Sequence, residues 1–255
     1  ITKVLLKLIP KPAAKKTMVA TFDAMDQAAQ TVSDIIAAQI IPCTLEFLDR
    51  TTIHCVEDFA KVGLPLDCEA LLLMETDGHP AAVAEEAAKM EDLAKANGAK
   101  EVRVAKDDAE AAQLATARRS AFSALARLAP TIILEDATVP RSELAHMIRF
   151  VAEVAKRHEL KIGTFGHMGD GNIHFNLSQP EDTEGETFLA KWERVNRLVH
   201  DLVDDLGGSF SAEHGIGQLK KDDLRRYKSA VELELMETLK RSLDPNNIMN
   251  PGKVL

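Results

Sequence analysis

The chain has 255 residues, 45% of them hydrophobic, and a formal net charge of −9. This hydrophobic content supports a globular core and excludes a disordered chain. The acidic balance argues against nucleic acid and anionic membrane surfaces as partners, and no apolar run approaches the ~20 residues of a transmembrane helix. Three cysteines without a CxxC spacing are typical of reduced thiols, so we expect a cytoplasmic protein.

The first half of the chain shows the apolar periodicity of alternating strands and helices. Strands are predicted at residues 17–23, 43–47, 70–76 and 101–105, and helices at 25–38 and 80–96. The second of these helices is rich in alanine and is ended by Asn97-Gly98. The resulting order, β-α-β-β-α-β, is the ferredoxin-like pattern.

The second half repeats this order of elements without an obvious repeat of residues. Strands are predicted at residues 131–135, 160–165, 172–177 and 208–212, and helices at 141–158 and 183–206. A long helix at 107–129 connects the halves, and one or two helices and a turn-rich tail occupy 218–255. We therefore predict an α+β fold in which residues 17–217 hold two ferredoxin-like units, 17–105 and 131–212. Their antiparallel sheets are expected side by side or face to face.

The segment GTFGHMGDGNIHFNL, residues 163–177, joins two predicted strands through a glycine-rich turn. The turn brings His167 at the end of one strand back toward His174 in the next. Strand alternation places Asn176 on the same face as His174. Two neutral imidazoles form half of a site for zinc or a similar divalent ion. A turn whose histidines only satisfy each other remains an alternative.

The segment SAEHGIGQ, residues 211–218, supplies a third metal ligand for the same half of the fold. Glu213 follows a short predicted strand that belongs to the sheet of the histidine hairpin. Two histidines and one carboxylate are a common catalytic metal set. The neighbouring His214 is then left beside the metal as an acid or base.

Three motifs in this order and spacing resemble the C-terminal domain of FAD-linked oxidases in the vanillyl-alcohol-oxidase superfamily. They are HMGDGNIHFN, GGSFSAEHGIGQLK and DPNNIMNPGKVL, and TLEFLDR and DATVPR match as well. The resembling branch contains the bacterial glycolate oxidase flavin subunit, D-lactate dehydrogenase and D-2-hydroxyglutarate dehydrogenase. The chain begins ITKVLLKL without an initiator methionine. The resemblance implies that residues 1–16 leave an N-terminal FAD-binding domain that precedes Ile1.

The resemblance also implies roles for individual residues. His167, His174 and Glu213 fall on the family's metal ligands, and His214 falls on the base for the substrate hydroxyl. Arg118 or Arg119, in ATARRSAF, falls where relatives bind the substrate carboxylate. Asn176 and His214 line the substrate and the flavin ring, and Asn250 lies in a tail that runs back toward the flavin domain.

The function implied is the substrate- and metal-binding half of a flavin-dependent D-2-hydroxy-acid dehydrogenase or oxidase. Relatives that act on 2-hydroxyglutarate carry a lysine where this chain has Leu134, which favours glycolate or D-lactate. The expected cofactors are FAD, held mainly by the preceding domain, and a divalent metal, with zinc as the expected ion. An electron-acceptor subunit and a homodimer are further expected partners, and the isolated chain is expected to be inactive.

Two other functions remain open on the residues alone. A metal-dependent hydrolase would use a metal-bound water with His214 as acid or base. A non-catalytic binding or oligomerisation module is the other possibility, because ferredoxin-like units often pair through their sheets.

Overall fold

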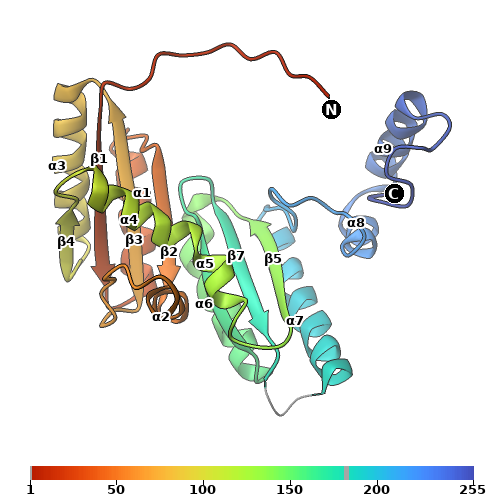
Figure 1. Cartoon of the computed structure of the whole chain (residues 1–255). Helices are drawn as coiled ribbons and strands as arrows, with labels where there is room; N and C mark the ends of the chain where they lie inside the picture. The colour runs from red at the N-terminus through yellow and green to blue at the C-terminus, as the bar shows by residue number, and fades with distance from the viewer. Residues whose placement is uncertain (1, 181–183) are drawn as a thin grey trace.

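The computed structural model describes residues 2–180 and 184–255, and its centre is one seven-stranded antiparallel sheet (Figure 1). The strand order is β4-β1-β3-β2-β6-β7-β5. Residues 2–13 precede the first strand without helix or strand. The α+β fold class predicted from the sequence is confirmed.

The first unit is a complete ferredoxin-like unit. Its elements are β1 (Ala14–Phe22), α1 (Met25–Ala37), β2 (Thr44–Asp49), α2 (Arg50–Ala60), β3 (Ala70–Gly78), α3 (Pro80–Ala96) and β4 (Glu101–Val104). Helix α2 is an insertion, and it begins where the Asp49 carboxylate accepts the Thr52 N–H. The order β4-β1-β3-β2 within the sheet is that of the predicted β-α-β-β-α-β pattern.

The second unit repeats the same path with three strands. Its elements are β5 (Ile132–Thr138), the 3-10 turn η1 (Arg141–Glu143), α6 (Leu144–Arg157), β6 (Lys161–His167), β7 (Asn172–Ser178) and α7 (Gly185–Asp205). The predicted start of the last helix at Thr183 lies outside the described residues. Within the sheet the strands lie in the order β6-β7-β5.

The strand predicted at 208–212 is reduced to a single bridge between Ser209 and Thr138. Gly208 passes so close to β5 that a Cβ would lie 2.3 Å from the Thr138 carbonyl oxygen. Beyond Ser211, three successive backbone N–H groups turn to the Asp136 side chain. These donors are therefore not available to a strand ladder, and the chain leaves the sheet edge as a loop.

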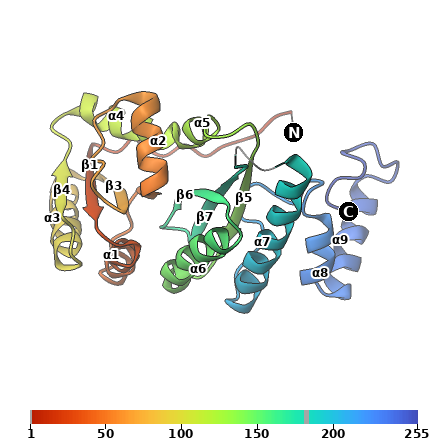
Figure 2. The same cartoon turned by 90° about the horizontal axis from the view of Figure 1, so that it is seen from below.

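The two units join edge to edge, because β2 pairs with β6 through Glu46–His167, Phe47–Gly166 and Leu48–Phe165. Helices α1, α3, α6 and α7 cover one face of the sheet (Figure 2). The other face carries α2, α4 (Asp108–Arg119) and α5 (Ala121–Leu125). The single helix predicted at 107–129 is thus two helices that are separated at Ser120.

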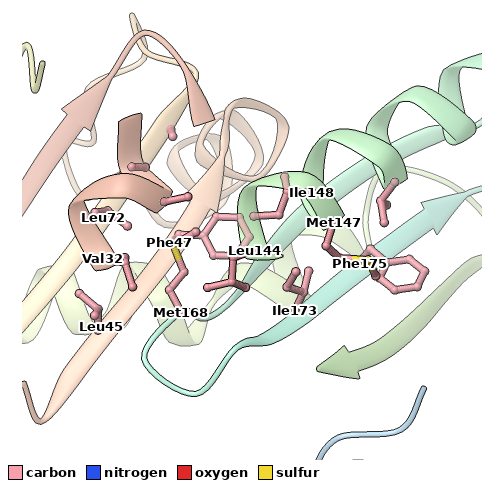
Figure 3. Close-up of a cluster of buried hydrophobic side chains, with 14 of the residues drawn as sticks. Val32, Leu45, Phe47, Leu72, Leu144, Met147, Ile148, Met168, Ile173 and Phe175 are labelled. Atoms are coloured by element: carbon pink, nitrogen blue, oxygen red, sulfur yellow. The ribbon is translucent and has the colours of Figure 1, made fainter. Parts of the chain in front are cut away.

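One apolar core runs under both units on the α1 and α6 side of the sheet. Figure 3 shows Val32, Leu45 and Phe47 of the first unit near Leu144 and Met168 of the second. Phe47, Leu144 and Met168 are fully buried. This shared core fixes the two units relative to each other.

The C-terminal region contains α8 (Lys221–Tyr227) and α9 (Ala230–Leu243), as expected for two helices after residue 217. It stands apart from the sheet in Figure 1. The Val254 N–H bonds the Gly217 carbonyl oxygen and ties the tail to the loop that follows Glu213 and His214. Within 2–180 and 184–255, no helix combines the length and the apolar character that crossing a membrane requires.

Candidate metal and substrate site

The histidine hairpin is held in place by its turn. Met168 packs into the core, and the Gly169 N–H donates to the carbonyl oxygen of Leu45. Gly171 has a φ of +76°, and a Cβ there would lie 2.1 Å from the Val139 carbonyl oxygen. Only glycine accepts both conditions without strain. The turn therefore sets His167, at its start, at a fixed distance from β7.

Two imidazole nitrogens of the hairpin converge on one carboxylate oxygen. His167 Nε2 lies 3.4 Å and His174 Nε2 lies 3.2 Å from Glu213 Oε1. Glu213 comes from the loop after α7, about 40 residues further along the chain. The structure thus brings together the three residues that the sequence predicted as metal ligands.

His214 lies next to His174 and Glu213 on the side of the group that faces solvent. Its ring stacks on that of His174, with centroids 5.0 Å apart and an interplanar angle of 7°. Its Nε2 lies 3.6 Å from Glu213 Oε1, and 43% of its side chain is exposed to solvent. His174 is only 4% exposed. His214 is therefore more accessible to solvent than His174 and than His167, which is 30% exposed.

Asp136 positions this loop against β5. Its Oδ2 accepts the backbone N–H groups of Ala212, Glu213 and His214 at 2.9 to 3.0 Å. Its Oδ1 lies 3.5 Å from His174 Nδ1. This buried carboxylate thus holds the loop through one oxygen, while its other oxygen lies beside the His174 ring, whose Nε2 faces Glu213.

Glu46 on β2 links His167 to an arginine. Its Oε1 lies 2.6 Å from His167 Nδ1, and its Oε2 accepts the Nε–H of Arg118 at 2.6 Å. The Arg118 guanidinium lies over the Phe165 ring at 4.8 Å and reaches 3.4 Å from His167 Nε2. The sheet register explains why Glu46 contacts His167, because the two residues are directly paired across β2 and β6.

The surroundings shift the pKa values of these groups in different directions. Burial lowers the pKa of His174 to about 4, so its imidazole is neutral at neutral pH. The hydrogen bond to Glu46 raises the pKa of His167. Burial acts to raise the pKa of Glu46, but His167 and the charge of Arg118 together bring it below its ordinary value. The neutral form of His174 is the one that binds a metal ion.

The donor set fits a divalent metal. Ligand atoms from Asp136, His174, Glu213 and His214 all lie within 4.8 Å of one another. Imidazole and carboxylate donors suit zinc and similar ions. This grouping contains the predicted ligands His174 and Glu213 but not His167, and it adds Asp136 and the predicted base His214. The division into a ligand role for His167 and a base role for His214 stays a prediction.

The other predicted site residues occupy different surroundings. Arg118 is partly buried in the site, whereas Arg119 is exposed and donates to the Thr116 hydroxyl. Asn176 is fully buried on the His174 face of β7 and donates to the Gly163 carbonyl oxygen. Its amide oxygen has no hydrogen-bond partner among the described residues. Asn250 lies in the exposed tail, where its carbonyl oxygen accepts the Lys253 N–H.

A cavity of about 470 Å³ adjoins the group at Glu46 and His167. The turn residues Gly169 and Asp170 line one part of it, and Arg141 also contributes. The remaining lining is mainly apolar and comes from residues 36–45. Such a space accommodates a small molecule beside Glu46 and His167.

Reasoning from the sequence missed Glu46 and Asp136 as site residues, although both lie in segments noted for their resemblance. Each is an acidic residue that follows apolar residues within a strand, TLEFLD and IILEDAT. A buried carboxylate in a strand is rare without a partner. That signal marks both positions, but the partners emerge only from the strand register.

A family model described as "FAD linked oxidases, C-terminal domain" matches residues 11–254. The chain belongs to this family. The FAD-linked oxidase relatives include the "Glycolate oxidase subunit GlcD" of Bacillus subtilis, which is 45% identical over 100% of this chain and 54% of its own length. The subunit of the same name from Escherichia coli is 35% identical over 99% of the chain and 50% of its own length.

A "D-lactate dehydrogenase" of Anaerostipes hadrus is 28% identical over 100% of the chain and 55% of its own length. The chain therefore spans about half the length of the relatives that it matches. Among solved structures, a 4-ethylphenol oxidase from Gulosibacter chungangensis aligns with a TM-score of 0.68 at 14% identity. This alignment covers 98% of the chain and 55% of the oxidase. At this identity the similarity establishes the fold of this FAD-linked oxidase domain.

Proposed function

We propose that the chain is the substrate- and metal-binding half of a flavin-dependent D-2-hydroxy-acid dehydrogenase or oxidase. The observation that carries the proposal is the convergence of three imidazoles, from His167, His174 and His214, on one oxygen of Glu213 at 3.2 to 3.6 Å. The arginine beside this group, Arg118, offers a positive charge for a carboxylate. A 2-hydroxy acid needs both features, one for each of its oxygen functions.

In this proposal His167, His174 and Glu213 hold a divalent metal, with zinc as the expected ion. When bound, the metal lowers the pKa of a coordinated hydroxyl group. Glu46 holds the His167 ring through its Nδ1, and Asp136 Oδ1 lies 3.5 Å from His174 Nδ1, so that Nε2 of each ring is on the side of Glu213.

His214 acts as the general base. It takes the proton of the substrate hydroxyl at Nε2, and the oxidation leaves a 2-oxo acid. A bound flavin would supply the acceptor for the hydride of the substrate Cα. The exposed edge of His214 makes this proton transfer possible without moving the buried His174.

The substrate carboxylate is proposed to bind Arg118 in preference to Arg119. The Nε of Arg118 is held by Glu46, which presents the rest of the guanidinium to the site. Arg119 faces solvent from the next position of α4. Asn176 and Asn250 stay proposed contacts of substrate or flavin, and the free amide oxygen of Asn176 is consistent with such a role.

A small substrate of the glycolate or D-lactate type is proposed. The cavity at Glu46 is of moderate size and mainly apolar away from the histidines. Leu134 pairs with Asn176 across β5 and β7, so an apolar side chain lies where a second carboxylate would need a cation. The names of the relatives, oxidases and dehydrogenases, disfavour the hydrolase alternative.

The proposal is tested with the complete protein that carries this chain and the flavin domain proposed to precede it. D-2-hydroxy acids are screened with an artificial dye as electron acceptor, and metal content is measured on the same preparation. Turnover of glycolate or D-lactate with bound FAD and about one divalent metal per chain is expected. A flavoprotein that contains metal but oxidises no 2-hydroxy acid would overturn the assignment.

The isolated chain is proposed to bind no FAD in stoichiometric amount, because the flavin is held mainly by the other domain. A yellow, active preparation of residues 1–255 would contradict this. An electron-acceptor subunit and a homodimer are proposed partners, and copurification and sedimentation of the complete protein test them.

A further inference from the structure

A buried charged cluster lies on the opposite side of β5 from the histidines. Its centre is Lys220, which is only 7% exposed. The Lys220 Nζ lies 3.1 Å from Glu135 Oε2, and Glu135 also accepts the Trp192 Nε1–H at 3.2 Å. Strand alternation explains the arrangement, because Glu135 and Asp136 are adjacent and point to opposite faces of the sheet.

The remaining donors of Lys220 go to backbone carbonyl oxygens. One is that of Phe210 in the loop at 2.7 Å, and the other is that of Asp136 in β5 at 2.9 Å. Two of the three donors of this ammonium group thus go to carbonyl oxygens, and Glu135 is its ion-pair partner. Lys220 therefore ties the loop to the strand residue whose side chain caps Ala212, Glu213 and His214 on the other face.

Aromatic packing holds the same part of the loop. Phe210 is buried, and its ring lies 5.5 Å from that of His200 and 5.3 Å from that of Tyr227. His200 is fully buried between Glu135 and Asp223, at 3.9 and 3.4 Å. These contacts seat the loop, but they leave its carbonyl oxygen to be satisfied by Lys220.

We propose that Lys220 is a positioning residue that holds the 210–214 loop against β5, so that Glu213 and His214 face His174. The inference deepens the proposed function, because it assigns the last residue of the GGSFSAEHGIGQLK motif to the same site. Lys220 touches neither the metal ligands' side chains nor the cavity beside them. It acts through the backbone on both sides of the loop.

The alternative role for Lys220 is only to neutralise Glu135, which is buried as well. The two roles separate in a double variant. Lys220→Met alone leaves the Glu135 carboxylate buried without its cation, which is strongly destabilising. Glu135→Gln combined with Lys220→Met removes both charges and still removes the two donors to carbonyl oxygens.

The experiment measures hydrogen exchange of peptides that cover residues 209–219 in the complete protein, together with the affinity for Zn²⁺ alone. Lys228→Met is the matched control, because Lys228 is a nearby lysine with one surface ion pair, to Glu232 at 3.5 Å. Each variant is also unfolded in denaturant, so that exchange is compared among molecules that are folded.

In the double variant we expect exchange in residues 209–219 to accelerate at least about 10-fold and Zn²⁺ affinity to fall by about 10–100-fold, the range for residues that orient metal ligands. Lys228→Met is expected to match the unmodified protein in both. A double variant with normal protection of the loop and normal Zn²⁺ affinity overturns the proposal and leaves Lys220 as a countercharge.

If the single variant does not fold, the double variant decides the matter. Hydrogen exchange of residues 209–219 is measured without turnover. It therefore tests the positioning role of Lys220 even if the protein oxidises no 2-hydroxy acid. Absence of Zn²⁺ binding in the unmodified protein would count against the proposed function, while the exchange result would still support or overturn the role of Lys220.

Discussion

The two ferredoxin-like units share a path but differ on the sheet face that lies under α2, α4 and α5. In the first unit this face is mostly apolar, with Val19 on β1 and Leu73 on β3 in one buried cluster, although Glu46 on β2 extends toward His167. In the second unit the corresponding strands, β5 and β7, present Asp136, His174 and Asn176. The same backbone plan therefore supports a core in one unit and a polar site in the other.

The difference at the sheet edge accompanies this change of polarity. The first unit ends in β4, which pairs with β1 over four residues. At the equivalent edge, the second unit has one bridge at Ser209 and then a loop. A complete strand would direct alternate side chains away from the face, whereas the loop capped by Asp136 brings Glu213 and His214 in succession to the histidines. The second unit therefore forms the site with a loop at the edge where the first unit has the strand β4.

The largest effect on metal content and turnover is expected from substitutions of the histidines on the polar face of the second unit. His174→Ala should lose metal and turnover together, because this buried imidazole is the innermost ligand. His214→Ala should keep the metal and lose turnover by about 10²–10⁴-fold, as expected for a general base. Elemental analysis and steady-state kinetics of the complete protein measure both.

His146→Ala is the control, since His146 is half-exposed on α6 and pairs only with Glu143. Loss of metal in His214→Ala would instead favour the ligand group of Asp136, His174, Glu213 and His214. Parallel measurement of His167→Ala then distinguishes the two ligand sets.

The apolar face should respond in stability and not in metal binding. Leu73 is 4% exposed in the apolar cluster of the first unit. Leu73→Ala should lower the free energy of unfolding by about 2–5 kcal/mol, the usual cost of a buried cavity. Denaturant unfolding measures this loss, and metal content per folded molecule should stay unchanged.

Leu66→Ala serves as the control, because Leu66 is 40% exposed. It should change stability by less than about 0.5 kcal/mol. If Leu73→Ala lowered metal affinity as much as a change on the second unit does, the functional separation of the two units would be wrong.

A smaller effect is expected from the residue that caps the loop. Asp136→Ala removes the acceptor of three backbone N–H groups and the partner of His174 Nδ1. Metal affinity should fall by about 10–100-fold, and calorimetric titration with Zn²⁺ measures it. Asp170→Ala, in the exposed hairpin turn, is the matched control, and equal losses in the two variants would contradict the assignment.

The smallest effect concerns the seam between the units. Asp49 at the end of β2 accepts the Thr164 N–H of β6, and burial raises its pKa from 3.8 to about 6. The folded protein then binds a proton more tightly than the unfolded chain. The contribution of Asp49 to stability is therefore greatest below pH 4 and falls as the pH rises to about 6, by at most about 1.4 kcal/mol per pH unit.

Unfolding of the unmodified protein and of Asp49→Asn at pH 4.5 and pH 7 checks this. The stability of the unmodified protein relative to Asp49→Asn should be larger at pH 4.5. A difference that is the same at both values, or larger at pH 7, would show that Asp49 does not titrate in this window.

The sequence by itself predicted most of the order of elements and named the residue types that meet at the candidate site. Periodicity and end signals located the elements of both units, because a pattern of apolar residues is a local property of a strand or helix. The spacing of His167 and His174 around a glycine turn predicted their proximity for the same reason. Glu213 and His214 were identified as residue types that suit a metal and a base.

Only the tertiary structure decided how the units join and which carboxylates support the histidines. Glu46 meets His167 because β2 pairs with β6 across 121 positions of the chain. Asp136 turns the chain away from the sheet at the end of the predicted strand 208–212 by accepting the N–H groups of residues 212–214. Lys220 closes the arrangement from the other face. These contacts depend on strand register and on the two faces of a shared sheet, which no local pattern of residues encodes.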